Sequence, residues 1–149
     1  DAPELKDDYY LNLLDWSAKG QLAIGLEGKV YLYSPEGINL FAKNNKKIIF
    51  AHFFSPQGDQ LAVGIDNGKT EIYDVETQTL LRTLKGHTNR VSSSAFTYGL
   101  LFTGSRDTKI IAHDIRSAHN VVLKLEGHRG EVCGLKHDAC GLASGSNDN

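Results

Sequence analysis

Four potential zinc ligands lie within 13 residues near the C-terminal end of the chain: His128, Cys133, His137 and Cys140. A structural zinc site needs four such donors that converge at about 2.0 to 2.3 Å, usually from tight turns. Cys133 and His137 instead fall on one predicted strand, which separates them by about 13 Å. His128 belongs to a Gly-His pair that recurs along the chain. We therefore expect no metal site.

The residues Ser105, Asp107 and His113 have the side-chain types of a Ser-His-Asp hydrolase. The same positions belong to a repeated strand and turn, in which a buried carboxylate and an imidazole satisfy each other's hydrogen bonds. We therefore expect a structural role for them, with no catalytic residues, no cofactor and no enzymatic activity.

The composition narrows the classes of partner. The chain has 149 residues, of which 40% are hydrophobic, and 16 Lys and Arg stand against 18 Asp and Glu for a net charge of −2. This balance lacks the basic footprint with which proteins bind nucleic acids or anionic membranes. No apolar run reaches about 18 residues, the length of a membrane span. From the charge balance and the short apolar runs, we expect neither nucleic acid nor membrane as a partner. The presence of only two cysteines and the absence of an Asn-x-Ser/Thr sequon favour a reducing compartment.

A short motif occurs four times along the chain. It stands at residues 22–25 (LAIG), 61–64 (LAVG), 101–104 (LFTG) and 142–145 (LASG), with spacings of 39, 40 and 41 residues. Gly-His pairs at 86–87 and 127–128 keep the same period, as do the runs 30–33 (VYLY), 71–74 (EIYD) and 111–114 (IAHD). A period of about 40 to 45 residues with these marks is the signature of WD repeats, each of which forms a four-stranded propeller blade.

The repeats predict an all-β fold, a WD-repeat β-propeller. We place blade 1 at about 9–41, blade 2 at about 46–86, blade 3 at about 87–127 and the start of blade 4 at 128–149. Closed propellers have roughly 4 to 8 blades, whereas 149 residues supply only about 3.5. Residues 1–149 are therefore expected to be a partial propeller domain, the first half of a seven-bladed ring.

The third repeat carries a hydrogen-bonding pattern that links a turn carboxylate to the sheet interior. A His, a Ser or Thr, an Asp and a Trp form this chain in WD repeats, but His113 stands here at the Trp position. The second repeat has Val63 and Asn67 at matching places, so its network is expected to be incomplete. The expected structural network comprises His87, Thr103, Asp107, His113, His128, Ser144 and Asp148.

Several segments resemble the Fizzy and Fizzy-related family, the cell-division-cycle-protein-20 type of WD-repeat activators of the anaphase-promoting complex. The opening segment, residues 1–17 (DAPELKDDYYLNLLDWS), is similar to the family's first blade. Later segments agree in the same order: 104–107 with 113–116, 125–128 with 131–136, and 144–149. The chain departs from the family at the Trp of each first strand, since it keeps Trp16 but has Phe54, Phe96 and His137.

The resemblance implies a substrate receptor of a ubiquitin ligase in the nucleus and cytoplasm. Its partners would be anaphase-promoting complex subunits, substrates with destruction-box (Arg-x-x-Leu) or Lys-Glu-Asn degrons, and cyclin- or securin-like pseudosubstrate inhibitors. By family position, Asp1 would contact the destruction-box Arg, while Asp8, Tyr9 and Asn147 would line the Lys-Glu-Asn site. The alternative is a diverged WD-repeat interaction scaffold without ligase activation, because the ligase-docking segments of the family lie outside these residues.

The acidic residues near the N-terminus and the Asn-Asp pair near residue 147 also admit a purely structural interpretation. Asp7 and Asp8 suit a solvated turn, and Asn147 and Asp148 suit a tight turn, in which we assign Asp148 to the repeat network. However, the start of the first strand in a blade and the turn between its second and third strands lie at the same end of an antiparallel sheet. Residues 1–9 and 146–149 are therefore expected on one face of the molecule, where a carboxylate suits Lys or Arg and an amide suits Asn.

Overall fold

The computed structural model describes residues 8, 10–26, 28–43, 49–97, 99–138 and 140–149, which form fourteen strands and no helix. The first sheet contains β1 (Leu14–Trp16), β2 (Leu22–Leu26), β3 (Lys29–Ser34) and β4 (Gly37–Lys43). The second contains β5 (Ile49–Phe54), β6 (Gln60–Ile65), β7 (Thr70–Asp74) and β8 (Leu80–Leu84). The third contains β9 (Val91–Phe96), β10 (Leu100–Ser105), β11 (Ile110–Asp114) and β12 (Val121–Leu125). β13 (Val132–Asp138) and β14 (Gly141–Ser146) form a two-stranded sheet.

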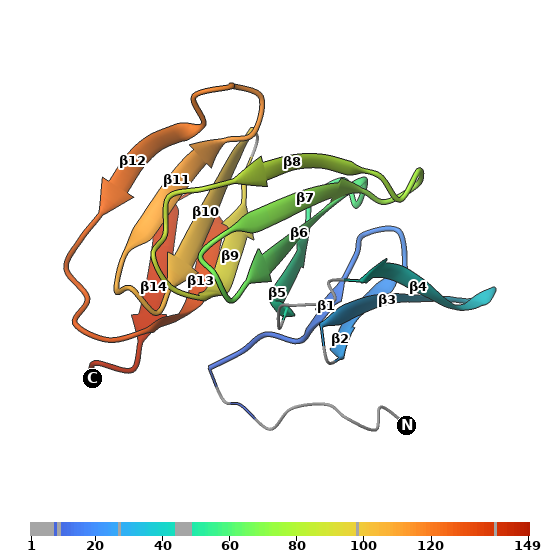
Figure 1. Ribbon diagram of the computed structural model, residues 1–149, viewed down its shortest axis with the longest axis horizontal. Coiled ribbons are helices and arrows are strands. Elements are labelled where there is room, and N and C mark those ends of the chain that lie inside the picture. Colours follow the sequence, from blue (N-terminus) through green and yellow to red (C-terminus); the bar gives the residue numbers. More distant parts are fainter. Residues whose placement is uncertain (1–7, 9, 27, 44–48, 98, 139) are drawn as a thin grey trace.

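Every sheet is an antiparallel meander, in which each strand pairs with the next one in the chain. The first strands of successive sheets, β1, β5, β9 and β13, contact one another, and Figure 1 shows the four sheets standing side by side in chain order. This all-β arrangement of four-stranded blades is part of a β-propeller, as the 40-residue period predicts. Among the described residues there is no helix that is long and apolar enough to cross a membrane.

The hydrophobic core lies between adjacent sheets rather than inside any one of them. Between the first two sheets, Val30 and Phe41 pack with Leu61, and the Phe41 and Tyr73 rings meet edge to face at 5.6 Å. Two further clusters join the second sheet to the third and the third to the fourth. Each sheet therefore depends on its neighbour for burial of its apolar face.

The glycine of the repeated motif permits the sheets to approach this closely. A Cβ at Gly64 would lie 2.6 Å from the carbonyl oxygen of Val91, at the start of the next sheet. A Cβ at Gly104 would lie 2.7 Å from Cγ1 of Val132, which begins the sheet after that. Val91 and Val132 are fully buried, so neither contact has room for another atom.

The outer strands differ in how much of the following sheet covers them, since the third sheet has four strands and the fourth has two among the described residues. Leu84, in the outer strand of the second sheet, is 1% exposed because the third sheet covers it. Leu125 holds the matching place in β12 and is 37% exposed, and its neighbours Val121, Val122 and Leu123 are exposed as well. In the first sheet, Trp16 of β1 is 60% exposed. Large apolar side chains thus remain exposed on both the first and the third sheet.

A continuous hydrogen-bond chain crosses the third sheet. The Asp107 carboxylate accepts a bond from Nδ1 of His87 at 3.0 Å, and Nε2 of His87 lies 2.9 Å from the Thr103 hydroxyl. That hydroxyl lies 3.1 Å from Nε2 of His113, whose Nδ1 lies 3.1 Å from Oδ1 of Asn120. His113 is 1% exposed, so an imidazole fills the interior position of the WD-repeat Trp.

The fourth sheet contains the same chain in shorter form. His128 Nδ1 lies 3.1 Å from the Asp148 carboxylate, and its Nε2 lies 2.9 Å from the Ser144 hydroxyl. In the second sheet the matching Val63 is buried and provides no hydrogen-bonding group. The network therefore differs from sheet to sheet and is longest in the third.

The first prediction concerns the Asp107 carboxylate, which accepts bonds from His87 and from the backbone N–H groups of Thr88 and Lys109. Asp107→Ala leaves these donors unsatisfied and should lower the free energy of unfolding of the intact protein by about 2 to 4 kcal/mol, measured by urea denaturation. Asp66→Ala, in the matching turn of the second sheet, removes an exposed carboxylate and serves as the control. Equal losses in the two variants would contradict a specific role for the network.

The second prediction concerns pH. Burial lowers the pKa of His113 from 6.5 to about 4, and burial also lowers the pKa of His87. The unfolded chain takes up these protons below about pH 6.5, so it binds more protons than the folded chain between pH 6.5 and 4. The free energy of unfolding should therefore fall as the pH falls through this window, with about 2 to 3 kcal/mol attributable to His113.

Urea denaturation of the intact protein at several pH values between 7 and 4 measures this slope. His113→Gln should flatten this slope, whereas His119→Gln, which removes an exposed imidazole from the loop between β11 and β12, is the control and should leave the slope as it is. A His113→Gln variant that keeps the full slope would show that other groups cause the pH dependence.

Candidate functional site

A cavity of about 530 Å³ opens at one end of the third and fourth sheets. The residues around it come from the N-terminal segment, from the residues before β9 and β13, and from the turns after β10 and β14. They are Asp8, Tyr10, Arg90, Arg106, Thr108, Arg129, Gly130, Glu131 and Asn147. Parts of the chain that are far apart in sequence therefore meet at this cavity.

Two backbone hydrogen bonds explain why turns and strand beginnings converge here. The N–H of Arg106, in the turn after β10, donates to the carbonyl oxygen of Arg90 at 3.0 Å. One repeat later, the N–H of Asn147 donates to the carbonyl oxygen of Glu131 at 3.1 Å. The antiparallel meander thus fixes each turn beside the beginning of the first strand of its own sheet.

The N-terminal segment reaches the cavity from the first sheet. Figure 1 shows its described part, in blue, running from β1 toward the ends of β13 and β14. Asp8 forms a local turn there, because its Oδ1 accepts a bond from the N–H of Tyr10 at 3.0 Å and its carbonyl oxygen accepts one from Leu11 at 3.1 Å. This turn directs the second carboxylate oxygen toward the third sheet.

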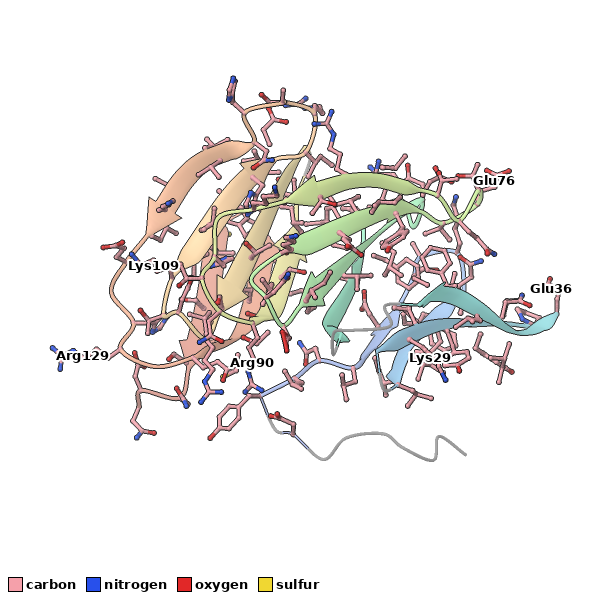
Figure 2. The ribbon with its side chains drawn as sticks, in the orientation of Figure 1. Lys29, Glu36, Glu76, Arg90, Lys109 and Arg129 are labelled. Atoms are coloured by element: carbon pink, nitrogen blue, oxygen red, sulfur yellow. The ribbon has the colours of Figure 1, made fainter. Side chains whose placement is uncertain are left out.

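The guanidinium group of Arg90 joins the N-terminal segment to the third and fourth sheets at this cavity. Arg90 donates two parallel bonds to the Glu131 carboxylate, from Nε at 2.6 Å and from Nη2 at 2.7 Å. Its Nη1 donates to Oδ2 of Asp8 at 3.2 Å. Figure 2 shows Arg90 beside the N-terminal segment. The hydrogen bonds that Arg90 donates to Glu131, together with the charges of Glu131 and Asp8, raise the pKa of Arg90.

Glu131 is the more buried member of this ion-pair cluster, at 5% exposure. A buried carboxylate requires a partner that satisfies both oxygens, and the planar guanidinium of Arg90 meets this requirement. Sequence analysis missed both residues. The available signal is that Arg90 and Glu131 occupy the same repeat position, just before the buried Val91 and Val132, with opposite charges.

Asn147 is exposed at the edge of the same cavity. Its side-chain oxygen lies so close to Gly130 that a Cβ there would collide with it. Gly130 therefore leaves the space that the Asn147 carboxamide needs, and Glu131 binds the Asn147 backbone. The carboxamide can both donate and accept hydrogen bonds to a ligand.

The sequence-predicted residues are distributed as follows. Asp8 and Asn147 lie on one cavity, whereas Asp1 and Tyr9 lie outside the described residues. Asp148 accepts bonds from His128 and from the N–H of Arg129 at 2.6 Å, which is its repeat role.

The residue sets that suggested zinc or hydrolase chemistry have other partners. His137 stacks on Phe102 with ring centroids 5.8 Å apart, and both Cys133 and Cys140 are free thiols. Within the described part of the chain, no three His, Cys, Asp or Glu side chains are grouped to hold a metal ion. The Ser105 hydroxyl donates to the carbonyl oxygen of Asn89 at 3.0 Å, while His113 contacts Thr103 and Asn120. These contacts do not form a nucleophile–base pair.

Another cavity, of about 600 Å³, lies at the opposite end of the sheets between β1, β5, β9 and β13. Its carboxylate, Asp15, accepts a bond from the N–H of Phe54 at 2.7 Å and thereby links the first two sheets. Burial raises the pKa of Asp15. This carboxylate has a structural partner, and the cavity at the turn end offers more groups for ligand binding.

Comparisons with known proteins agree with this architecture. Residues 26–99 match the sequence family described as the anaphase-promoting complex subunit 4 WD40 domain. The whole chain aligns at 44% identity with protein FIZZY-RELATED 2 of Arabidopsis thaliana, covering 32% of that protein. It aligns at 43% identity with anaphase-promoting complex subunit cdc20 of Dictyostelium discoideum, covering 31%. The chain thus spans about a third of the length of these relatives.

Among solved structures, the whole chain superimposes on 47% of a chain in the crystal structure of a mitotic checkpoint complex. The TM-score is 0.96 and the sequence identity is 43%. At this identity the likeness extends beyond the fold to the sequence.

Proposed function

The chain belongs to the Fizzy and Fizzy-related family of WD-repeat proteins, and on this basis we propose that it is part of a substrate-recognition and activator subunit of the anaphase-promoting complex. The intact protein binds destruction-box and Lys-Glu-Asn degrons on cell-cycle proteins and presents their owners for ubiquitination. Its partners are subunits of the complex, degron-bearing substrates and pseudosubstrate inhibitors. It acts in the nucleus and cytoplasm and catalyses no reaction itself.

The observation that carries this proposal is the meeting of Asp8 and Asn147 on one cavity. These two residues come from opposite ends of the chain, and the family resemblance assigns both to the Lys-Glu-Asn site. A carboxylate beside a carboxamide matches a ligand that carries a lysine and an asparagine close together. Their convergence supports a recognition site for a short peptide.

The charges around the cavity also suit a peptide with side chains of both signs. Asp8 and Glu131 contribute two carboxylates, while Arg90, Arg106 and Arg129 contribute three guanidinium groups. Sheltered charge-assisted hydrogen bonds of this kind contribute about 1.5 to 3 kcal/mol each. The lining residues lie in turns and in segments just before strands, and the backbone bonds Arg106–Arg90 and Asn147–Glu131 tie these turns to their own sheets.

The third prediction tests the assignment by peptide titration of the intact protein at fixed ionic strength. Asp8→Ala and Asn147→Ala should each weaken a Lys-Glu-Asn peptide by about 1 to 3 kcal/mol, roughly tenfold to a hundredfold, and leave an Arg-x-x-Leu peptide nearly unaffected. Asp1→Ala should show the opposite preference, because it removes the partner of the destruction-box Arg.

Asp66→Ala, an exposed carboxylate in a turn of the second sheet outside the cavity, is the matched control and should change neither affinity. Equal losses for both peptides in all three variants would indicate misfolding. No loss in any variant would favour the interaction scaffold without degron recognition.

A further inference from the structure

The ion-pair cluster of Asp8, Arg90 and Glu131 links both residues that are proposed to contact the ligand. Arg90 binds Asp8 through Nη1 at 3.2 Å and binds Glu131 through its other two nitrogens at 2.6 and 2.7 Å. The main-chain carbonyl oxygen of Glu131 in turn accepts a bond from the backbone N–H of Asn147 at 3.1 Å. Glu131 therefore connects Arg90 and Asp8, through its carboxylate, with Asn147, through its backbone.

The geometry makes the position of Asp8 dependent on Glu131. Two parallel bonds to Glu131 fix the plane of the Arg90 guanidinium, and a planar guanidinium has its remaining N–H groups in fixed directions. Nη1 is thereby directed at Oδ2 of Asp8, while the Tyr10 N–H holds Oδ1. The Asp8 carboxylate is restrained at both oxygens before any ligand arrives.

The burial of the three side chains agrees with an order in which Glu131 orients Arg90 and Arg90 orients Asp8. Side-chain exposure is 4% for Glu131, 15% for Arg90 and 27% for Asp8. The innermost carboxylate orients the guanidinium, and the guanidinium orients the outermost carboxylate, which is the member nearest to solvent. Because a bidentate Arg has a rigid fork, Lys at this position retains the charge but cannot reproduce both contacts.

We propose that Arg90 and Glu131 are positioning residues for Lys-Glu-Asn recognition, which hold the Asp8 carboxylate in its ligand-binding place opposite Asn147. This inference rests on the proposed function, since it concerns the same cavity. Arg90 acts through Asp8, and its role is distinct from general stabilisation of the fold.

The test measures the affinities of a Lys-Glu-Asn peptide and an Arg-x-x-Leu peptide for the intact protein and its variants. Arg90→Lys should weaken the Lys-Glu-Asn peptide about tenfold and change the Arg-x-x-Leu affinity less than about twofold. Arg116→Lys is the matched control, because Arg116 is exposed in the turn after β11, is paired with Asp114 and lies outside the cavity. It should change neither affinity.

A charge-swapped variant keeps the test decisive if single substitutions at the buried pair prevent folding. Arg90→Glu combined with Glu131→Arg restores an ion pair but places a carboxylate beside Asp8. It should abolish Lys-Glu-Asn binding and leave a folded protein that binds the Arg-x-x-Leu peptide.

The results separate this inference from the proposed function. Wild-type protein that binds a Lys-Glu-Asn peptide, together with Arg90→Lys and charge-swapped variants that bind it equally well, would overturn the positioning role alone. Parallel losses of both peptides in Arg90→Lys would show a purely structural role and would also overturn it. Wild-type protein that binds neither peptide would overturn the proposed function and this inference together.

Discussion

The close contact between the second strand of one sheet and the first strand of the next is the constraint on which the rest of the structure depends. Gly64 against Val91 and Gly104 against Val132 set the spacing of successive sheets, because neither contact has room for a Cβ. This spacing places Arg90, just before Val91, within bidentate reach of Glu131, just before Val132. A larger residue at Gly104 would therefore disturb both the core and the cavity.

The fold could be predicted from the sequence because each repeat carries the local signals for its own strands and turns. The 40-residue period, the Gly-His pairs and the turn signals predict four-stranded meanders, and the structure confirms an all-β partial propeller. The structure also explains two of the residues that replace Trp in the first strands. Phe54 is buried, and His137 keeps an aromatic contact by stacking on Phe102.

The candidate site could be predicted only in part. The antiparallel order of the strands places Asp8 and Asn147 at one end of the sheets, but it does not identify the residues that join them. Arg90 and Glu131 look like ordinary surface charges in a sequence, because their pairing depends on the angle between two sheets. No local pattern encodes that angle. Opposite charges at equivalent repeat positions are a weak signal, which becomes meaningful only when the neighbouring valines are known to be buried.

The contrast between Leu84 and Leu125 bears on how such a chain is synthesised. Leu84 is covered by a following sheet of four strands, whereas Leu125 is followed by a sheet with two strands among the described residues and is 37% exposed. A propeller that emerges from the ribosome blade by blade therefore always carries one uncovered apolar flank at its growing end. The interval between completing one blade and the next is a period of aggregation risk, and slow translation through a blade would lengthen it.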